Sequence, residues 1–243
     1  MRTTERNTLK VPKKLGHIWI GPKVPPTEWM KTWIDKHPDW AYTLYDNDYL
    51  YNNEFRTWPQ IEEYLKRGWY AGAADLLRYE ILYREGGYLA GADSLCLHPI
   101  DELLEDGGEL YTVYENEFLR GQLVAPIVAA VPGHPFVKEL IDRLSSVAPR
   151  DLDHPWKQTG NLFVAELIEE LKPEITIWPS HTLIPEHFIG RKYKGTGKVY
   201  ARQLFGETNK AYKYKSWLDR LRSVKQSWYA SAARKHLRSR NRT

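Results

Sequence analysis

A single helix-to-strand unit in the middle of the chain constrains the fold most. Residues 71–85 predict a helix, because four apolar side chains share one side of it: Leu76, Leu77, Ile81 and Leu82. The pair Gly86-Gly87 marks the end of this helix. The apolar residues 88–90 follow at once and predict a short buried strand. A helix joined so tightly to a strand is typical of α/β proteins, and we expect that fold class here.

The same alternation of strands and helices runs along most of the chain. The expected strands cover residues 15–20, 40–45, 88–90, 110–114, 123–130, 175–178 and 199–204. The expected helices cover residues 28–36, 61–67, 71–85, 134–146 and 161–171. This order favours a mostly parallel sheet flanked by helices, and such sheets bind ligands at the carboxyl ends of their strands.

Charge divides the chain into a body and a tail. Residues 1–208 carry 24 Lys and Arg against 30 Asp and Glu, whereas residues 209–243 carry 11 basic residues and one acid. The tail has an apolar residue at every third or fourth position: Trp217, Leu221, Val224 and Trp228. We therefore expect a flexible N-terminus over 1–10, one domain over 11–208 and a basic amphipathic helix over 209–243. The preferred interpretation of its basic face is a solvated helix surface that ends in frayed residues. The alternative is contact with an anionic membrane surface or an acidic partner, and nucleic acid is the less favoured partner.

Composition places the chain among soluble globular proteins. Hydrophobic residues make up 42% and charged residues 27%, which excludes a disordered polymer or a collagen-like fibre. No apolar run approaches the roughly 20 residues that cross a bilayer, and residues 1–10 lack a secretory apolar segment. The one cysteine, Cys96, cannot form an intramolecular disulfide, so we expect a reducing, cytoplasmic setting.

Several kinds of catalytic site are excluded by the motifs. The chain has no P-loop, no Gly-x-Gly-x-x-Gly turn after a strand and no Gly-x-Ser-x-Gly elbow. Eight scattered histidines and one cysteine make a zinc site improbable. Cys96 is better explained as a buried small side chain than as a nucleophile, because no spacing indicates a partner histidine.

Three charged residues remain as candidates for chemistry. Asp75 and Arg78 lie one turn apart on the central helix, where the simplest alternative is a surface ion pair. Asp93 follows the strand at 88–90, where a carboxylate can meet Mg²⁺ or Mn²⁺ at a sheet edge. The alternative for Asp93 is a turn residue or a helix N-cap.

The stretch around these residues resembles glycosyltransferase family 32, the DXD-containing sugar transferases, which are similar to the glucosylating domains of large bacterial toxins. The resemblance rests on AADLLR at 73–78, YREGG at 83–87 and CLHPID at 96–101. It extends to HIWIG at 17–21, HPDW at 37–40, Thr159-Gly160 and the segment 200–208, and so covers residues 11–208.

The resemblance implies a Rossmann-like GT-A fold and transfer of a sugar, with retention of configuration, from a UDP- or GDP-sugar to an acceptor. It implies that Asp75 and Arg78 bind the donor sugar, with Trp19 at the base and Asp93 on Mn²⁺ or Mg²⁺ beside Gln203. Asp46 is implied to face the nucleotide, and Asn161 is expected at the acceptor side of the donor site. The acceptor itself is left open between a protein, a glycolipid and a glycan.

Two departures from the family pattern concern the metal. The D-x-D position reads Gly91-Ala92-Asp93, and Gln203 stands where many members have histidine. A missing carboxylate weakens a Mn²⁺ site, and an amide oxygen is a poorer ligand for Mn²⁺ than imidazole. Two alternatives to an active transferase therefore remain: a weakened relative that binds nucleotide or glycan, and an interaction protein that acts through its basic tail.

Overall fold

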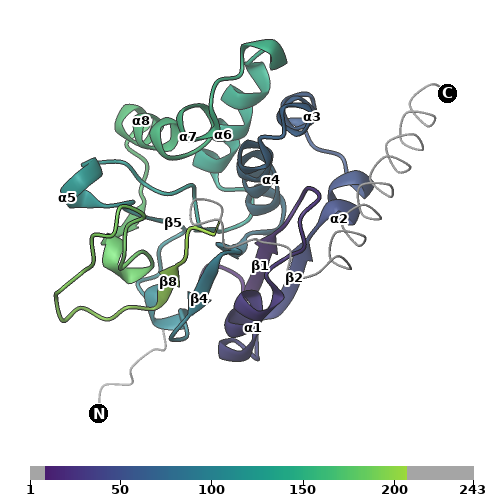
Figure 1. Ribbon diagram of the computed structural model, residues 1–243. Helices are drawn as coiled ribbons and strands as arrows, with labels where there is room; N and C mark the ends of the chain where they lie inside the picture. The colour runs from purple at the N-terminus through teal and green to yellow at the C-terminus, as the bar shows by residue number, and fades with distance from the viewer. Residues whose placement is uncertain (1–8, 207–243) are drawn as a thin grey trace.

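The computed structural model describes residues 9–206, which form one sheet-centred unit with helices on both faces (Figure 1). The expected basic helix over 209–243 and the N-terminal residues 1–8 lie outside the described residues. Within residues 9–206, no helix has both the length and the apolar character that a bilayer crossing requires.

The main sheet has six strands in the order β2-β1-β3-β6-β5-β7. These are β1 (Lys14–Ile18), β2 (Ala41–Tyr45), β3 (Gly87–Ala90), β5 (Leu110–Val113), β6 (Ala129–Ala130) and β7 (Thr176–Trp178). Only β6 runs against its neighbours, because its pairings with β3 and β5 are antiparallel while the other pairings are parallel. The expected α/β class with a mostly parallel sheet is therefore confirmed.

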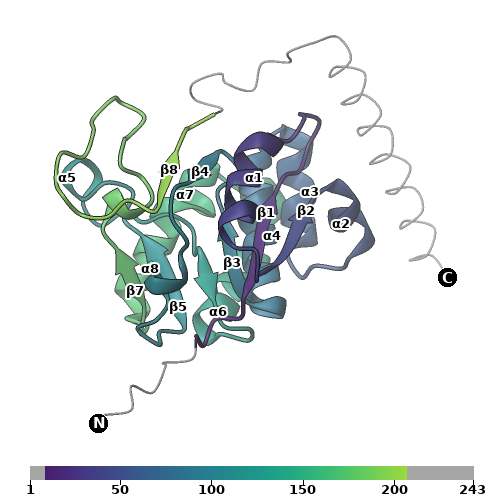
Figure 2. The same ribbon diagram turned by 90° about the horizontal axis from the view of Figure 1, so that it is seen from below.

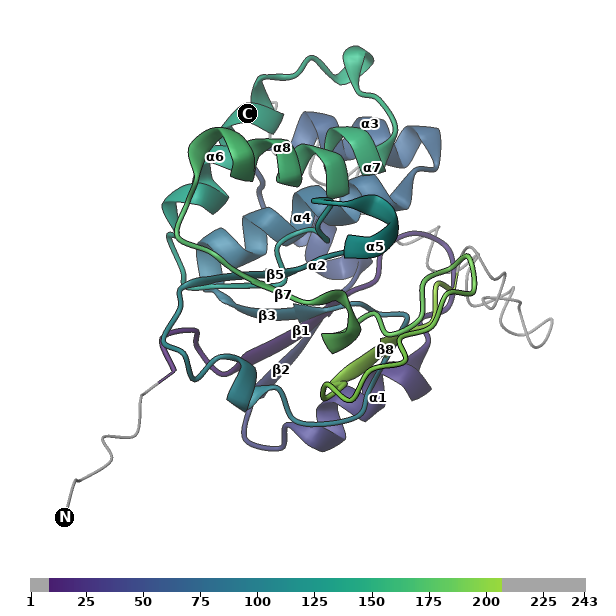
Figure 3. The ribbon, with the colours of Figure 1, turned by 90° about the vertical axis from the view of Figure 1, so that its left-hand side faces the viewer.

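Two apolar cores lie on the two faces of this sheet. Figure 3 shows the sheet with α4, α6 and α8 on one side of it and α1 on the other. One face packs against α2 (Asn47–Asn52), α3 (Trp58–Arg67), α4 (Tyr70–Glu85), α6 (Pro135–Ser146) and α8 (Asn161–Leu171). The other packs against α1 (Thr27–Lys36) and a second, two-stranded sheet. Along β3 the side chains alternate, since Leu89 belongs to the first core and Tyr88 and Ala90 to the second.

The central helix-to-strand unit forms as expected. Gly86 ends α4 by donating its N–H to Leu82 O across 2.9 Å, and Gly86 and Gly87 both adopt positive φ. At Gly87 a Cβ would stand 2.5 Å from Lys14 O, so the absence of a side chain lets β3 start close beside β1. This turn places the first half of α4 above the carboxyl ends of β1 and β3.

Some sequence-based boundaries differ from the structure. The apolar run 123–130 yields only the short β6, because residues 123–128 are largely irregular. The segment expected as a strand over 199–204 forms β8 (Ala201–Gln203), which pairs with β4 (Ser94–Cys96) outside the main sheet. The short helices α2, α5 (Glu117–Arg120) and α7 (Pro155–Gln158) and the strand β4 were not expected. The helix α7, like η2 (Pro149–Asp151), begins with a proline.

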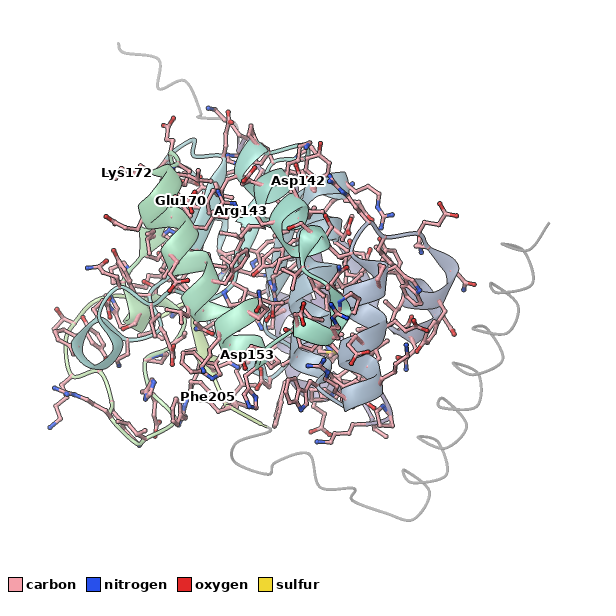
Figure 4. All side chains as sticks on the ribbon, turned by 90° about the horizontal axis from the view of Figure 1, so that it is seen from above. Asp142, Arg143, Asp153, Glu170, Lys172 and Phe205 are labelled. Atoms are coloured by element: carbon pink, nitrogen blue, oxygen red, sulfur yellow. The ribbon has the colours of Figure 1, made fainter. Side chains whose placement is uncertain are left out.

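Ion pairs on the helical face join neighbouring helices. Figure 4 labels Arg143 on α6 and Glu170 on α8, whose side chains meet in two hydrogen bonds of 2.7 and 2.5 Å. Such exposed pairs contribute only about 1 kcal/mol or less. The buried apolar residues beneath them therefore fix the positions of α6 and α8.

Candidate functional site

A cavity of about 800 Å³ opens at one edge of the main sheet. Three parallel strands, β1, β3 and β5, point their carboxyl ends at it. The residues there that line its wall are Ile18, Trp19, Leu89, Gly91, Ala92, Asp93, Val113 and Glu115. The start of α4 and the β4–β8 sheet, which lies beside α1 in Figure 2, complete the wall. The expected ligand-binding edge is therefore where a cavity of small-molecule size lies.

Arg78 and Asp75 lie side by side at the floor of this cavity, both projecting from α4. Arg78 Nη1 donates to Leu89 O across 2.6 Å and more weakly to Ile127 O across 3.4 Å. These carbonyls hold one end of the guanidinium, which has five N–H donors in all, and Arg78 lines the cavity. The pair belongs to a cavity, so the alternative of a simple surface ion pair is wrong.

The surroundings of Asp75 raise its pKa and fix the position of its carboxyl group. Burial raises the pKa of Asp75 to about 7, and the Arg78 charge and the Thr159 hydroxyl partly oppose that rise. Thr159 Oγ1 donates to Asp75 Oδ2 across 2.9 Å. Tyr79 OH in turn donates to Thr159 O across 2.5 Å, so the Thr159-Gly160 turn is fastened to α4 at two points. This explains in local terms why Thr-Gly stands before α8.

Asp93 also lines the cavity, and it receives hydrogen bonds from residues 203–206 at the end of the described chain. Gln203 Nε2 donates to its Oδ1 across 2.5 Å, and Gly206 N donates to its Oδ2 across 2.9 Å. Leu204 N donates to the Asp93 main-chain oxygen across 2.8 Å. Asp93 is therefore not a helix N-cap: it lies in the turn between β3 and β4, as the alternative had it, and its side chain also joins this turn to residues 203–206 at the cavity wall.

The side-chain amide of Gln203 lies beside Gly91, the position that lacks the first carboxylate of the family pattern. A Cβ on Gly91 would stand 2.9 Å from Gln203 Oε1 and 3.7 Å from Asp93 Oδ1. A carboxylate can only accept hydrogen bonds, so Gln203 presents its nitrogen to Asp93 and its oxygen toward Gly91. An amide oxygen thus stands near the position where the family pattern has its first carboxylate.

The donors at this wall fit a divalent ion that takes most of its ligands from elsewhere. In the part of the chain that the structure describes, no three His, Cys, Asp or Glu side chains gather around one point. Asp93 offers one carboxylate with spare lone pairs and Gln203 offers one amide oxygen. Mg²⁺ in proteins is commonly held by one or two carboxylates together with substrate phosphates and water. The residues present therefore fit an ion delivered with a diphosphate.

Trp19 lines the cavity just after β1. Its ring nitrogen donates to Lys23 O across 2.7 Å, and Lys23 lines the cavity too. The loop between them is held by Asn47, whose side chain makes two hydrogen bonds to the Gly21 main chain, of 2.8 and 2.9 Å. Asp46 lies outside the lining residues and caps α2 by accepting from Tyr49 N across 3.0 Å.

Asn161, at the start of α8, reaches the cavity together with a residue that the sequence did not indicate. Asn161 Nδ2 donates to Glu115 Oε2 across 3.1 Å, and His187 Nε2 lies 3.3 Å from Glu115 Oε1. Glu115 and His187 are both buried. Glu115 lies in an irregular segment just after β5. Its position after a predicted strand, which it shares with Asp93, was the one sequence feature that could have marked it as a site residue.

Aromatic rings supply much of the remaining wall, among them Trp69, Tyr70, Trp156, Phe188 and Phe205. Trp69 stacks on His154 with ring centroids 4.5 Å apart. Phe205, labelled in Figure 4, packs edge-on against Phe188 at 5.7 Å. Flat apolar surfaces beside a few charged groups suit a ligand that combines rings with hydroxyl or phosphate groups.

Cys96 takes no part in this cavity. Its side chain is buried in the second core, and burial raises the pKa of its thiol to about 12. A thiol of this kind is not ionised at neutral pH and is a poor nucleophile. The interpretation as a buried small side chain is confirmed.

Residues 26–107 match the family model described as the glycosyltransferase sugar-binding region containing a DXD motif. The matched segment includes Asp75, Arg78 and Asp93. The resemblance inferred from the sequence is confirmed by this match and by the relatives described next.

Two curated relatives come from Schizosaccharomyces pombe. Inositol phosphoceramide mannosyltransferase 2 is 25% identical over 198 residues, which cover 78% of this chain and 55% of the relative. Inositol phosphoceramide mannosyltransferase 3 is 25% identical over 142 residues, which cover 57% of this chain and 38% of the relative. The chain thus spans about half the length of one relative and less of the other.

A solved structure titled PaToxG Glycosyltransferase shares the fold. It superposes with a TM-score of 0.52 at 16% identity, covering 67% of this chain and 70% of that chain. A likeness at this identity supports the fold alone. The argument for a function rests on the arrangement of residues in the cavity.

Proposed function

We propose that this chain, whose residues 26–107 carry the sugar-binding region of the DXD-containing glycosyltransferases, transfers a hexosyl group from a nucleoside diphosphate sugar to an acceptor. The observation that carries the proposal is the meeting of Asp75, Arg78 and Asp93 in one cavity at the carboxyl ends of the parallel strands. The names of the curated relatives support a mannosyl donor such as GDP-mannose, and a UDP-sugar is the alternative.

The floor of the cavity recognises the sugar. Arg78 donates from its guanidinium N–H groups to sugar hydroxyls, and the Asp75 carboxylate accepts from them. Both side chains are held in place before the donor arrives, Arg78 by the Leu89 carbonyl and Asp75 by Thr159. Fixed positions lower the entropic cost of orienting the anomeric carbon. A negative Asp75 also stabilises the positive charge that develops on the sugar ring.

The walls recognise the nucleotide. Trp19 offers a ring to the base, and Lys23 on the neighbouring wall offers a positive charge to the diphosphate. Asp46 caps α2 beside Asn47, so in this proposal it supports the loop that carries Trp19 and Lys23. Asn161, oriented by Glu115, lies toward the acceptor side.

We propose that transfer depends on Mn²⁺ or Mg²⁺, held by Asp93 and the Gln203 amide oxygen. When bound, the ion supplies positive charge that neutralises the departing diphosphate. Asp93 itself keeps the segment 203–206 at the cavity wall, so it has a role both with and without the bound ion. We also propose retention of configuration at the anomeric carbon, on the resemblance to the family.

The test is diphosphate release from a panel of UDP-, GDP- and dTDP-sugars, with and without Mn²⁺, by the full chain and by Asp93→Ala. Release from one donor that requires both the ion and Asp93 supports the proposal. Release that is equal in Asp93→Ala contradicts the metal assignment. Proton NMR of the first-formed product reports the anomeric configuration, and an inverted product contradicts retention.

A second candidate is favoured by Gly91. With a single carboxylate at the metal wall, the chain binds a nucleotide or glycan without efficient transfer. Binding of a donor sugar without release in any acceptor mixture favours this candidate. The third candidate is an interaction protein that acts through residues 209–243. Neither diphosphate release nor donor binding favours it; the result that favours it is that no donor binds at all. The single cysteine remains the basis for proposing a cytoplasmic setting.

A further inference from the structure

Three exposed apolar side chains lie on two neighbouring segments beside the cavity, α5 and the loop 186–198. Phe118 on α5 is 77% exposed, Ile189 is 60% exposed and Phe188 is 42% exposed. Phe118 is joined to the loop 186–198 by Arg191, whose guanidinium carbon lies 6.0 Å from the ring centroid. Figures 1 and 3 both show α5 beside this loop. We call Phe118, Phe188 and Ile189 the apolar patch; a cluster of this kind indicates an interaction surface.

The charge around the apolar patch differs from that of the rest of the domain. The loop 186–198 contains Arg191, Lys192, Lys194 and Lys198 against the single acid Glu186. Residues 9–206 together carry 22 basic and 28 acidic residues. A basic loop that displays large apolar side chains, on an otherwise acidic domain, has the composition of a segment that lies in the interface of an anionic bilayer.

The apolar patch is continuous with the candidate site. Phe188 contributes both to the patch and to the wall of the cavity, and its ring lies 4.1 Å from that of His187, which contacts Glu115. Trp156, 45% exposed, lines the same cavity. A molecule seated on the patch therefore has a direct path to the cavity.

We propose that the apolar patch and the basic loop 186–198 dock the domain on a bilayer that contains anionic lipid, so that a lipid headgroup supplies the acceptor hydroxyl. The choice of acceptor rests on the proposed function, whereas docking does not. Phe118 and Ile189 enter the interfacial layer, and Arg191, Lys192 and Lys194 contact lipid phosphates. The long stems of the basic side chains allow both contacts at once.

The test is co-sedimentation of the full chain with vesicles of phosphatidylcholine alone or mixed with phosphatidylserine. We expect binding to the mixed vesicles that weakens with added salt. Phe118→Ser/Ile189→Ser and Arg191→Glu/Lys192→Glu/Lys194→Glu should each weaken it about tenfold or more. The control is Leu97→Ser/Leu171→Ser, which removes two other exposed apolar side chains, 40% and 41% exposed, that are not part of the patch, and it should bind like the original chain.

The outcomes separate docking from catalysis. Residues 209–243 are present in every variant, so unchanged binding in both patch variants means that another segment holds the lipid and overturns the proposal. Equal binding to neutral vesicles overturns the role of charge, and no vesicle binding overturns docking. Diphosphate release from a soluble donor without vesicles reports the proposed function by itself. Far-ultraviolet circular dichroism confirms that each variant is folded.

Discussion

Gln203 Nε2 donates to Asp93 Oδ1 across 2.5 Å and thereby fastens β8 to the turn that follows β3. The two residues are 110 positions apart in the chain. Because the amide nitrogen faces the carboxylate, the amide oxygen faces Gly91, where a Cβ would stand 2.9 Å away. The two departures from the family pattern, glycine at 91 and glutamine at 203, are thus related in space, because the Gln203 amide oxygen lies beside Gly91.

Restoring the first carboxylate should strengthen the proposed metal site. Gly91→Asp adds a second negative oxygen ligand beside Asp93, and Gln203 can move because it is the flexible end of a side chain. We expect the Mn²⁺ dissociation constant in the presence of GDP to fall about tenfold, since affinity for hard cations rises with ligand charge. Titration calorimetry measures this without turnover.

Gly91→Ala is the control for this substitution, because it displaces Gln203 without adding a charge. It should bind Mn²⁺ no better than the original chain. If Gly91→Ala and Gly91→Asp shift the affinity equally, the gain is steric and the carboxylate is not a ligand.

Asp75 should make stability depend on pH. Its pKa is raised to about 7 in the folded chain against about 4 in the unfolded chain, so its stabilising contribution is complete at low pH and is lost as pH rises through 7. The Asp75→Asn side chain stays neutral and can still accept from Thr159. The difference in unfolding free energy, variant minus original chain, should therefore be larger at about pH 8 than at about pH 5. Guanidinium denaturation at both values measures the gain; an equal difference at both contradicts the raised pKa.

Glu115 should act by positioning Asn161. Glu115→Ala removes the acceptor of Asn161 Nδ2 and should lower kcat/KM about tenfold, equivalent to about 1.4 kcal/mol. Glu115→Gln keeps an acceptor oxygen and should recover most of that loss. Glu166→Ala changes an exposed acid on the same helix as Asn161 and should leave kcat/KM unchanged. If Glu115→Gln is as impaired as Glu115→Ala, the charge of Glu115 matters directly and positioning is not its role.

Asn47 should stabilise the loop that carries Trp19 and Lys23. Asn47→Ala removes two hydrogen bonds to Gly21, and we expect the free energy of unfolding to fall by about 1 to 3 kcal/mol. Donor binding should weaken further, because the cavity wall loses its anchor. Asn52→Ala, at an exposed position of the same helix, is the control. Comparable losses in both variants would assign the effect to helix α2 rather than to the loop.

The sequence was sufficient for features that depend on local pattern. The glycine pair after residues 71–85 predicted the turn from α4 into β3, and the alternation of elements predicted the mostly parallel sheet. Asp75, Arg78 and Asp93 were indicated by their place next to these elements, and the structure brings all three to one cavity. The residue roles inferred from the resemblance, including those of Trp19, Asp46, Asn161 and Gln203, stay predictions.

Features that depend on long-range packing could not be read from the sequence. Residues 201–203 have a strand pattern, but nothing local shows that they pair with β4 rather than with the main sheet. Glu115 is one acid in an acidic segment until His187, 72 positions away, meets it. The apolar patch is likewise invisible, because exposure of Phe118 and Ile189 is decided by what packs elsewhere.

Donor binding tests the central claim most directly. Trp19, Trp69 and Trp156 line the cavity, so titration of the full chain with GDP- and UDP-sugars in Mn²⁺ should change tryptophan fluorescence for at least one donor. The dissociation constant should rise about tenfold in Asp93→Asn and in Arg78→Lys, the latter because lysine lacks the planar donor fork. Binding of no donor, or binding that both variants leave unchanged, would contradict the assignment of this cavity to a nucleoside diphosphate sugar.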